Sequence, residues 1–243
     1  MSGCIGQMRC PLLRERLSNI REANLSNVSV HPENRRETFM TIRLHRGDLP
    51  DLSRYTQSVA IDTETLGLNP HRDRLCVVQL SPGDGSADVV QIPAGGSDAP
   101  NLKRLLADPG ILKIFHYARF DLAALSNTFG VWPMPLYCTK IASRLTRTYT
   151  DRHGLKDLVR ELVGVDLSKQ QQSSDWGAEV LTEPQIAYAA SDVLYLHAAK
   201  EKLDAMLARE GRTELAEACF RFLPHRAQLD LMGWAEQDIF SHS

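Results

Sequence analysis

Two carboxylates stand two residues apart in segment 59–68, whose sequence is Val-Ala-Ile-Asp-Thr-Glu-Thr-Leu-Gly-Leu. The apolar residues that precede Asp62 favour a β-strand, in which alternate side chains leave from the same face. Asp62 and Glu64 are therefore expected to point the same way. Two like charges held this close destabilise a fold unless a cation lies between them or they share a proton. From this pair alone, a divalent metal site and an acidic strand end facing solvent are equally good interpretations.

Two further acids and a tyrosine stand where apolar patterning does not place them by chance. Asp121 follows the apolar segment 111–115 and falls in the first turns of an expected helix. Tyr188 and Asp192 are four residues apart in a later helix, so they share one helix face. Taken singly, Asp121 could merely stabilise a helix N-terminus and Tyr188 could be a core residue. Together with Asp62 and Glu64, they form a pattern that indicates a functional site far more specifically than any one of these residues does.

The elements that must position these side chains follow from hydrophobic periodicity and from turn residues. Strands are expected at 40–45, through Asp62, and at 75–80, 88–92, 111–115 and 136–139, with helices at 101–106, 119–129 and 155–163, and one long helix from a capping box at Thr182 to near Gly211. Three consecutive strands form a meander, and strand and helix then alternate. This order predicts an α/β fold with a mixed sheet, the ribonuclease H-like arrangement among others.

Composition limits the class of protein. The chain has 243 residues, of which 43% are hydrophobic and 24% charged, and its net charge is −2. This favours one soluble domain whose contacts with nucleic acid, if any, are local. Five cysteines without a Cys-x-x-Cys pair argue against a disulfide framework and a zinc ribbon. The sequence also contains no membrane-spanning run and no signal-peptide core, so we expect a cytoplasmic protein without a membrane partner.

The two ends of the chain differ in kind from its middle. Residues 1–39 are rich in Asn, Ser, Arg and Glu, so we expect a disordered N-terminal extension. Met40 opens a clean strand pattern, and we expect it to be the natural start. Residues 220–234 are too apolar for a free tail, so they are expected to fold back over the core or to form a subunit interface.

The set formed by Asp62, Glu64, Asp121, Tyr188 and Asp192 matches the three exonuclease motifs of the DEDD superfamily in its tyrosine-containing subclass. Residues 40–243 resemble its ribonuclease D branch. Segments 146–156 and 167–176, together with the compact C-terminal tail, closely resemble the nanoRNase C family of oligoribonucleases. The chain departs from the broader superfamily in two ways. Tyr117 stands where many relatives carry Asn, and the tail beyond Gly211 is too short for the helical nucleic-acid-binding domain of full-length ribonuclease D.

The resemblance implies a ribonuclease H-like mixed five-stranded sheet flanked by helices, formed by residues 40–243 as one exonuclease domain. It implies a metal-dependent 3′–5′ exoribonuclease that hydrolyses very short RNA, chiefly 5′-phosphorylated dinucleotides, to nucleoside monophosphates. Such enzymes use two Mg²⁺ or Mn²⁺ ions roughly 3.5 to 4 Å apart. By the resemblance, Asp62 bridges both ions, Glu64 and Asp192 complete one, Asp121 acts on the other through water, and Tyr188 orients the attacking water. Closed homo-octameric rings are also implied.

Candidate substrate contacts come from the rest of the same motifs. In related oligoribonucleases an apolar residue at Leu66 wedges between the two bases, although Leu66 could instead pack the strand end. A basic stretch with an interleaved aromatic could grip a terminal phosphate through charge-assisted hydrogen bonds, and for any single member a solvated position is the alternative. Trp176 is interpreted as a packing residue. The full set of candidates is Leu66, Thr63, His116, Arg147, Tyr149, Arg152, His153, Lys169 and Gln172.

Two other functions stay open. One is an exonuclease of broader specificity that acts on RNA or DNA of any length. The other, from a different class, is a non-catalytic nucleic-acid-binding module that kept the fold. The presence of all five candidate catalytic residues favours an enzyme.

Overall fold

The computed structural model describes residues 28–30, 40–168 and 170–242. The expected disorder of residues 1–39 lies outside the described residues, except that Val28–Val30 form a short strand, β1. The expected substrate contact Lys169 also lies outside them. The division into an extension and one domain from Met40 stays a prediction.

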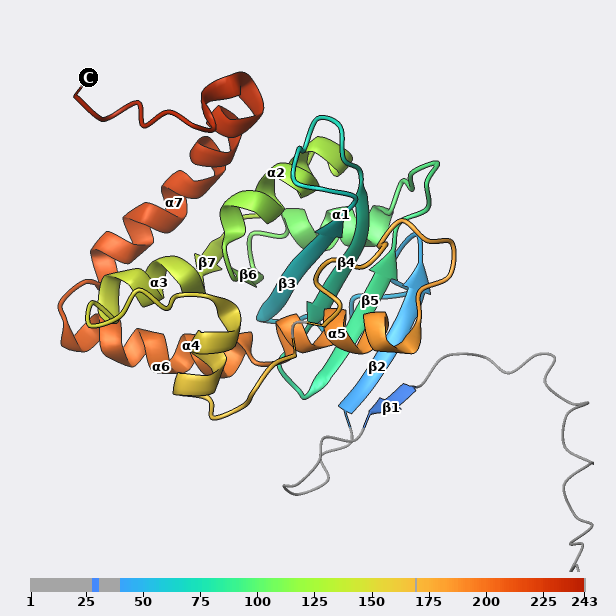
Figure 1. Ribbon diagram of the computed structural model, residues 1–243, viewed down its shortest axis with the longest axis horizontal. Helices are drawn as coiled ribbons and strands as arrows, with labels where there is room; N and C mark the ends of the chain where they lie inside the picture. The colour runs from blue at the N-terminus through green and yellow to red at the C-terminus, as the bar shows by residue number, and fades with distance from the viewer. Residues whose placement is uncertain (1–27, 31–39, 169, 243) are drawn as a thin grey trace, which may run out of the picture.

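The described strands form one mixed sheet in the order β1-β2-β5-β4-β3-β6-β7 (Figure 1). Their bounds are β2 Met40–Arg46, β3 Ser58–Thr65, β4 Leu75–Ser81, β5 Ser86–Gln91, β6 Leu112–Phe115 and β7 Leu136–Cys138. Strands β3, β4 and β5 are the antiparallel meander, and β6 and β7 continue the sheet parallel to β3. These five strands confirm the predicted ribonuclease H-like α/β fold.

The described sheet has seven strands, whereas the sequence pattern predicted six and the resemblance implied five. Strand β2 pairs in parallel with β5, and β1 pairs with β2 in antiparallel orientation. The alternating segment that opens at Met40 therefore does not stand apart from the sheet. It covers the edge of β5, whose six residues are all buried and whose backbone groups would otherwise lack partners.

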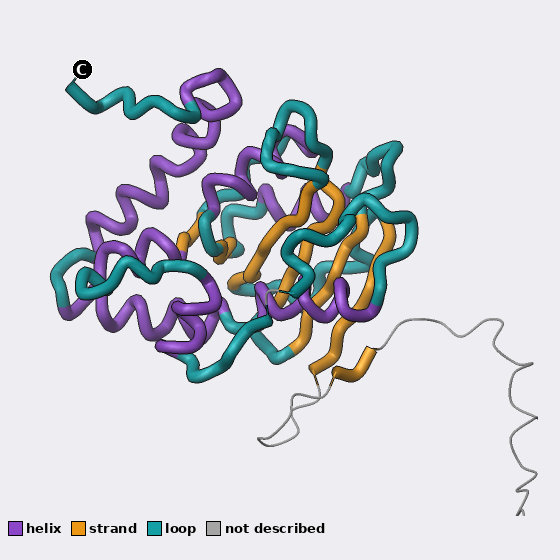
Figure 2. Tube along the Cα trace, in the orientation of Figure 1, coloured by secondary structure: helices purple, strands orange, loops and turns teal. Residues whose placement is uncertain are grey.

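Helices cover both faces of the sheet (Figure 2). Their bounds are α1 Pro100–Ala107, α2 Ala118–Phe129, α3 Thr139–Thr146, α4 Leu155–Leu162, α5 Glu183–Leu194, α6 Leu196–Arg209 and α7 Thr213–Leu229, and a π-helical turn, η1, spans Asp230–Trp234. Helix α5 packs on β3, β4 and β5, whereas α6 packs on α3 and α4. In the part of the chain that the structure describes, no helix has the length and apolar character needed to cross a membrane.

The long helix predicted from Thr182 to near Gly211 is instead two helices. Tyr195, with φ −108° and ψ 0°, closes α5 and opens α6. The local sequence contains no proline or glycine at this point, so propensity alone favours one helix. Tertiary packing separates the two helices, because α5 packs on the sheet whereas α6 packs on α3 and α4.

The apolar C-terminal run folds back over the core, which was one of its two predicted positions. Helix α7 packs on α2, and its residues Phe220, Leu223 and Ala227 are buried. Beyond them the chain emerges, and Met232 and Phe240 are 62% and 74% exposed. A subunit interface at this end therefore remains a prediction.

Helix α5 begins at the capping box that the sequence predicted. Thr182 Oγ1 accepts the backbone N–H of Gln185, and Gln185 Oε1 accepts that of Thr182 at 3.0 Å. We expect the substitution Thr182→Ala to lower the free energy of unfolding by about 0.5–2 kcal/mol, because one helix N–H loses its partner. Thermal unfolding followed by circular dichroism measures this change. Thr213→Ala is the matched control, since Thr213 starts α7 without a side-chain cap, and equal losses in both variants would contradict the assignment.

Candidate active site

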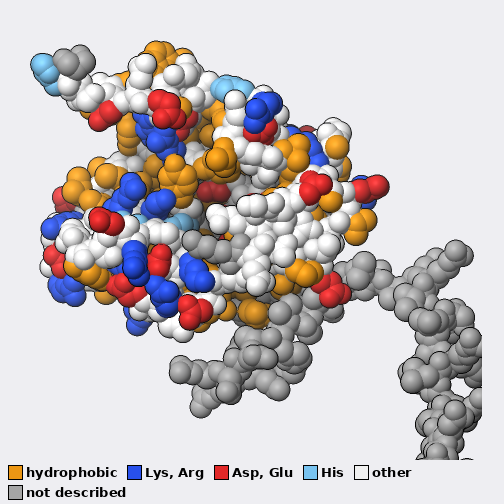
Figure 3. All heavy atoms as spheres, viewed as in Figure 1, with side chains coloured by type: hydrophobic (Ala, Val, Ile, Leu, Met, Phe, Trp, Pro, Cys, Tyr) orange, Lys and Arg blue, Asp and Glu red, His pale blue; other side chains and the backbone are white. Residues whose placement is uncertain are grey.

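Three carboxylates from two elements meet at the C-terminal end of β3. Val59, Ala60 and Ile61 are fully buried and fix β3 in the core, so the next residues carry Asp62 and Glu64 to the surface of the sheet. Helix α5 lies over the same strands and brings Asp192 to them. One oxygen of each carboxylate lies within 4.8 Å of the others, a spacing that could hold a metal ion. Figure 3 shows this face hollowed, with acidic side chains at the bottom.

Asp121 comes from helix α2, which follows the neighbouring strand β6, and it lies outside this group of three. Strand β6 runs parallel to β3 and leads into α2, so the first turn of α2 lies at the same sheet edge as Asp62. Asp121 is 3% exposed, and its Oδ1 accepts a hydrogen bond from Thr63 Oγ1 at 2.7 Å. Thr63, predicted to contact substrate, is itself buried and holds Asp121 in place.

Burial, joined for all but Asp62 by neighbouring negative charge, raises the pKa values of the four acids. Burial raises the pKa of Asp62 to about 7. Burial, followed by the charges of Asp62, Asp192 and Asp121, raises the pKa of Glu64 to about 10. The pKa values of Asp121 and Asp192 are also raised, by burial and then by the charge of Asp62.

Little in the protein offsets this repulsion. Gln79 Nε2 donates to Asp62 Oδ2 at 2.8 Å, and among the described residues no Lys or Arg forms a salt bridge with any of the four acids. Carboxylate oxygens are the ligands that Mg²⁺ and Mn²⁺ prefer. The residues present therefore fit a divalent cation, which would remove the mutual repulsion.

Tyr188 stands one turn before Asp192 on α5 and packs on a buried tryptophan. Its ring centroid lies 6.0 Å from that of Trp176, which is 3% exposed and has the packing position predicted for it. Burial, and then the charge of Asp192, raises the pKa of the Tyr188 hydroxyl. This hydroxyl stays protonated at neutral pH, so it can donate a hydrogen bond but is a poor base.

Known proteins share this fold and are similar in sequence. A family model described as 3′-5′ exonuclease matches residues 49–208. Brucella melitensis NrnC, solved with bound Mg²⁺, is 66% identical, with a TM-score of 0.81 over 84% of this chain and 100% of that one. The same protein solved with pGG is 67% identical, with a TM-score of 0.82 over the same shares of the two chains. The chain belongs to the 3′–5′ exonuclease family.

Curated relatives of this exonuclease are longer. The ribonuclease D of Acidiphilium cryptum (strain JF-5) is 38% identical over 156 residues, which are 64% of this chain and 39% of that protein. The chain thus matches well under half the length of that relative. The predicted ribonuclease D resemblance is confirmed for the exonuclease domain.

Leu66 directly follows the last residue of β3 and is 53% exposed, so its contact with the bases stays a prediction. The register of β3 against β4 shifts between Glu64 and Thr65, where Cys76 of β4 is passed over, and β3 ends at Thr65. Leu66 Cδ2 packs so closely on Gly177 that a Cβ there would lie 2.5 Å away. Leu68, which the strand pattern did not single out, is 84% exposed. The sequence feature that could have pointed to Leu68 is its position just after Gly67, at the end of the strand.

Arg147, predicted to contact substrate, is fully buried and its donors are engaged. Its guanidinium donates to the carboxylate of Glu161, to Ser143 Oγ at 2.9 Å and to the carbonyl of Arg152 at 2.8 Å. The cation therefore braces the loop after α3 and is not available to a phosphate. The prediction was wrong because sequence spacing does not reveal the partner fourteen residues away.

Two of the other candidate contacts, Tyr149 and His116, already have partners within the protein, and three others are open to solvent. Tyr149 is 66% exposed, but its hydroxyl donates to Glu161. His116 is partly buried, with Nδ1 2.9 Å from Thr139 Oγ1, and burial followed by the charge of Lys140 lowers its pKa to about 3. Solvent reaches the remaining described candidates, which are Arg152, His153 and Gln172.

A cleft of about 680 Å³ lies beyond the C-terminal ends of β3 and β6, and its lining includes none of the four acids. The loop after β3 forms one wall with Leu68 and Arg72, and the start of α2 forms another with Tyr117 and Phe120. Residues 230–236 complete the lining. Ligands of open α/β sheets bind outside the carboxyl ends of strands, which is the position of this cleft.

Stability without metal should fall as pH rises. The folded pKa values of Asp62 and Glu64, about 7 and about 10, are raised, so the folded protein binds more protons than the unfolded chain above about pH 4. The protonated carboxyl groups contribute fully to the free energy of unfolding below their unfolded-state pKa values. This contribution is lost as pH rises through their folded-state pKa values. We expect the melting temperature in EDTA to decrease between about pH 6 and pH 9, and excess Mg²⁺ to oppose the decrease.

The variant Glu64→Gln should flatten this dependence in EDTA, because a neutral amide replaces the carboxylate with the higher pKa. Glu217→Gln, at an exposed position on α7, is the matched control and should leave the slope unchanged. A metal-free protein whose melting temperature rises over this pH range would contradict the electrostatic description of the site.

Proposed function

We propose that this exonuclease is a metal-dependent 3′–5′ exoribonuclease that hydrolyses very short RNA, chiefly 5′-phosphorylated dinucleotides, to nucleoside monophosphates. The observation that carries the proposal is the convergence of Asp62, Glu64 and Asp192 within 4.8 Å, with Tyr188 one turn away on α5. The likeness to a protein solved with Mg²⁺ and with pGG supports both the metal and the length of the substrate.

The four acids would hold two divalent ions, Mg²⁺ or Mn²⁺. Asp62, Glu64 and Asp192 suit one ion directly, and Asp121, which is held by Thr63, suits a second beside Asp62. When bound, such ions neutralise charge on the scissile phosphate and acidify the attacking water. Tyr188 would orient this water through its protonated hydroxyl. Hydrolysis adds the water oxygen to phosphorus, breaks the bond to the 3′ oxygen, and leaves a 5′-monophosphate and a 3′-hydroxyl.

The exposed groups near the site would select the substrate. Leu66 and Leu68 offer apolar contacts to bases, which tolerate any sequence. Arg152, His153 and Gln172 remain the candidates for a terminal phosphate, and Lys169 remains one on the sequence alone. We further propose a cytoplasmic homo-octamer, which the nanoRNase C resemblance supports.

Variants at the site should separate metal ligands from the water-orienting group. We expect Asp192→Asn to abolish Mg²⁺-dependent hydrolysis, because an amide replaces a charged ligand. Tyr188→Phe should lower kcat by about 10²–10⁴-fold with little change in KM, because only the positioning of water is lost. Tyr195→Phe, at the junction of α5 and α6, is the control. Wild-type rates in Asp192→Asn would contradict the assignment of the site.

Substrate length distinguishes the proposal from a broader exonuclease. We expect the wild-type enzyme to hydrolyse 5′-phosphorylated dinucleotides at least about tenfold faster than heptanucleotides, a difference of about 1.4 kcal/mol in the barrier. Product lengths at limiting enzyme on a mixed-length, 5′-labelled RNA ladder measure this preference, and a DNA ladder serves for comparison. Similar rates at every length would favour the broader exonuclease of RNA or DNA.

A further inference from the structure

Tyr117 has a backbone conformation that its residue type disfavours. Its φ of 67° and ψ of 41° place it in the left-handed region, which is an outlier for a bulky side chain. Among the described non-glycine residues, Ala99 is the other with positive φ. Ala99 is 1% exposed and packs in the core, whereas Tyr117 is 46% exposed. Burial of the ring therefore does not explain why this conformation is kept.

Tyr117 lines the cleft beyond the C-terminal ends of β3 and β6. Tyr117 caps α2 directly after β6 and stands four residues before Asp121. Its side chain lines the cleft of about 680 Å³ together with Leu68 and Phe120. A flat, half-exposed ring thus faces the same space as the most exposed leucine of the β3 loop.

Lys140 holds the ring. Its Nζ lies 4.2 Å from the ring centroid of Tyr117, within the range of a cation–π interaction. Lys140 comes from α3, so the ring is supported by an element other than its own helix. The ammonium group also adds positive charge beside the cleft, which favours a ligand with phosphate groups.

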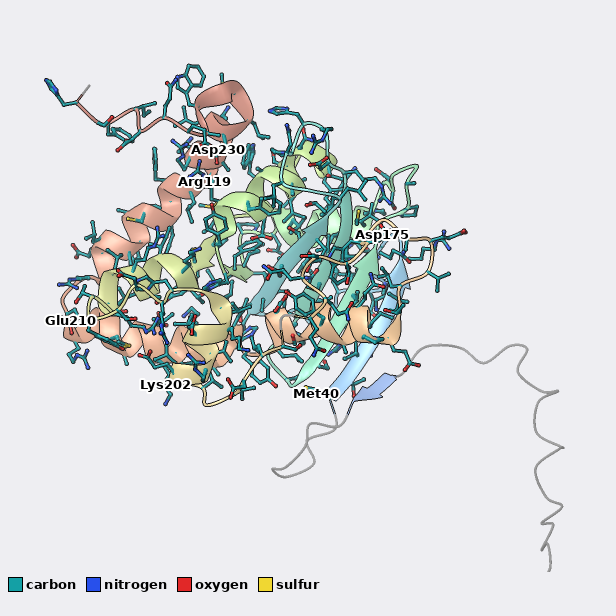
Figure 4. All side chains as sticks on the ribbon, viewed as in Figure 1. Met40, Arg119, Asp175, Lys202, Glu210 and Asp230 are labelled. Carbon is teal, nitrogen blue, oxygen red and sulfur yellow. The ribbon has the colours of Figure 1, made fainter. Side chains whose placement is uncertain are left out.

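The far wall of the cleft is fixed to the same turn of α2. Arg119 donates to both oxygens of Asp230, and Figure 4 shows the two side chains facing each other between α2 and the end of α7. Arg226 donates to Asp230 Oδ1 at 2.7 Å and to the carbonyl of Trp234 at 2.7 Å. Because these bonds fix residues 230–235 beside Tyr117, the cleft is a built feature of the fold.

We infer that Tyr117 is a stacking platform for a nucleobase of the substrate. The inference rests on the proposed function and adds a residue that contacts the substrate. Stacking on an aromatic ring tolerates every base, since each has a π-face. The left-handed backbone at Tyr117 sets the ring toward the cleft, Lys140 holds it there, and Leu68 offers an apolar contact in the same space.

Three variants test the inference on 5′-phosphorylated dinucleotides. Tyr117→Phe keeps the ring and should retain the wild-type KM, so it is the matched control. Tyr117→Leu should raise KM by about 5- to 100-fold, the range that single-base stacking energies imply, with a smaller effect on kcat. Tyr117→Asn should raise KM to a similar extent and should also raise the melting temperature, because Asn adopts the left-handed conformation more readily.

A dinucleotide that contains 2-aminopurine reports stacking directly. Its fluorescence should be quenched on binding to the wild-type and Tyr117→Phe proteins, and less quenched by Tyr117→Leu at saturation. Unchanged KM and quenching in Tyr117→Leu, with the wild type active, would overturn the inference and leave the proposed function intact. A wild-type protein that hydrolyses no RNA with Mg²⁺ or Mn²⁺ would overturn both.

Discussion

Mutual repulsion among four carboxylates is the constraint on which the architecture of this exonuclease depends. The acids sit where water is scarce, so burial raises the pKa values of Asp62 and Glu64, and the charges of the neighbouring acids raise that of Glu64 further. Neighbouring residues hold the acids in place in spite of the unfavourable free energy of this burial and repulsion. The residues of β3 before Asp62 are fully buried, Gln79 holds Asp62, and Thr63 holds Asp121. The site is thus held in place by parts of the protein that take no part in chemistry.

Much of the site could be predicted from the sequence because its spacing is set by regular structure. Strand alternation places Asp62 and Glu64 on one face, and helical spacing places Tyr188 beside Asp192. The order of strands and helices gave the meander and the parallel strands that follow it. These predictions depend on local geometry, which a strand or helix imposes whatever its neighbours are.

The parts that could not be predicted depend on neighbours distant in sequence. The close packing of Leu66 on Gly177 brings together segments that are far apart in the sequence. The helix from Thr182 breaks at Tyr195 because its two halves follow different surfaces. Arg147 belongs to the densest basic stretch of the chain, yet it is buried against Glu161. The sequence does not distinguish the Lys and Arg residues of such a cluster from one another, whereas the fold shows which of them already forms a salt bridge.

The ion pair between Arg119 and Asp230 joins residues 111 positions apart. One partner lies in the first turn of α2, two residues before Asp121, and the other is synthesised late. While residue 230 is still inside the ribosomal exit tunnel, that turn of α2 lacks its partner and one wall of the cleft is absent. The nascent chain therefore cannot complete this cleft, or the part of the core that α7 supplies, until nearly all of the described residues have been synthesised.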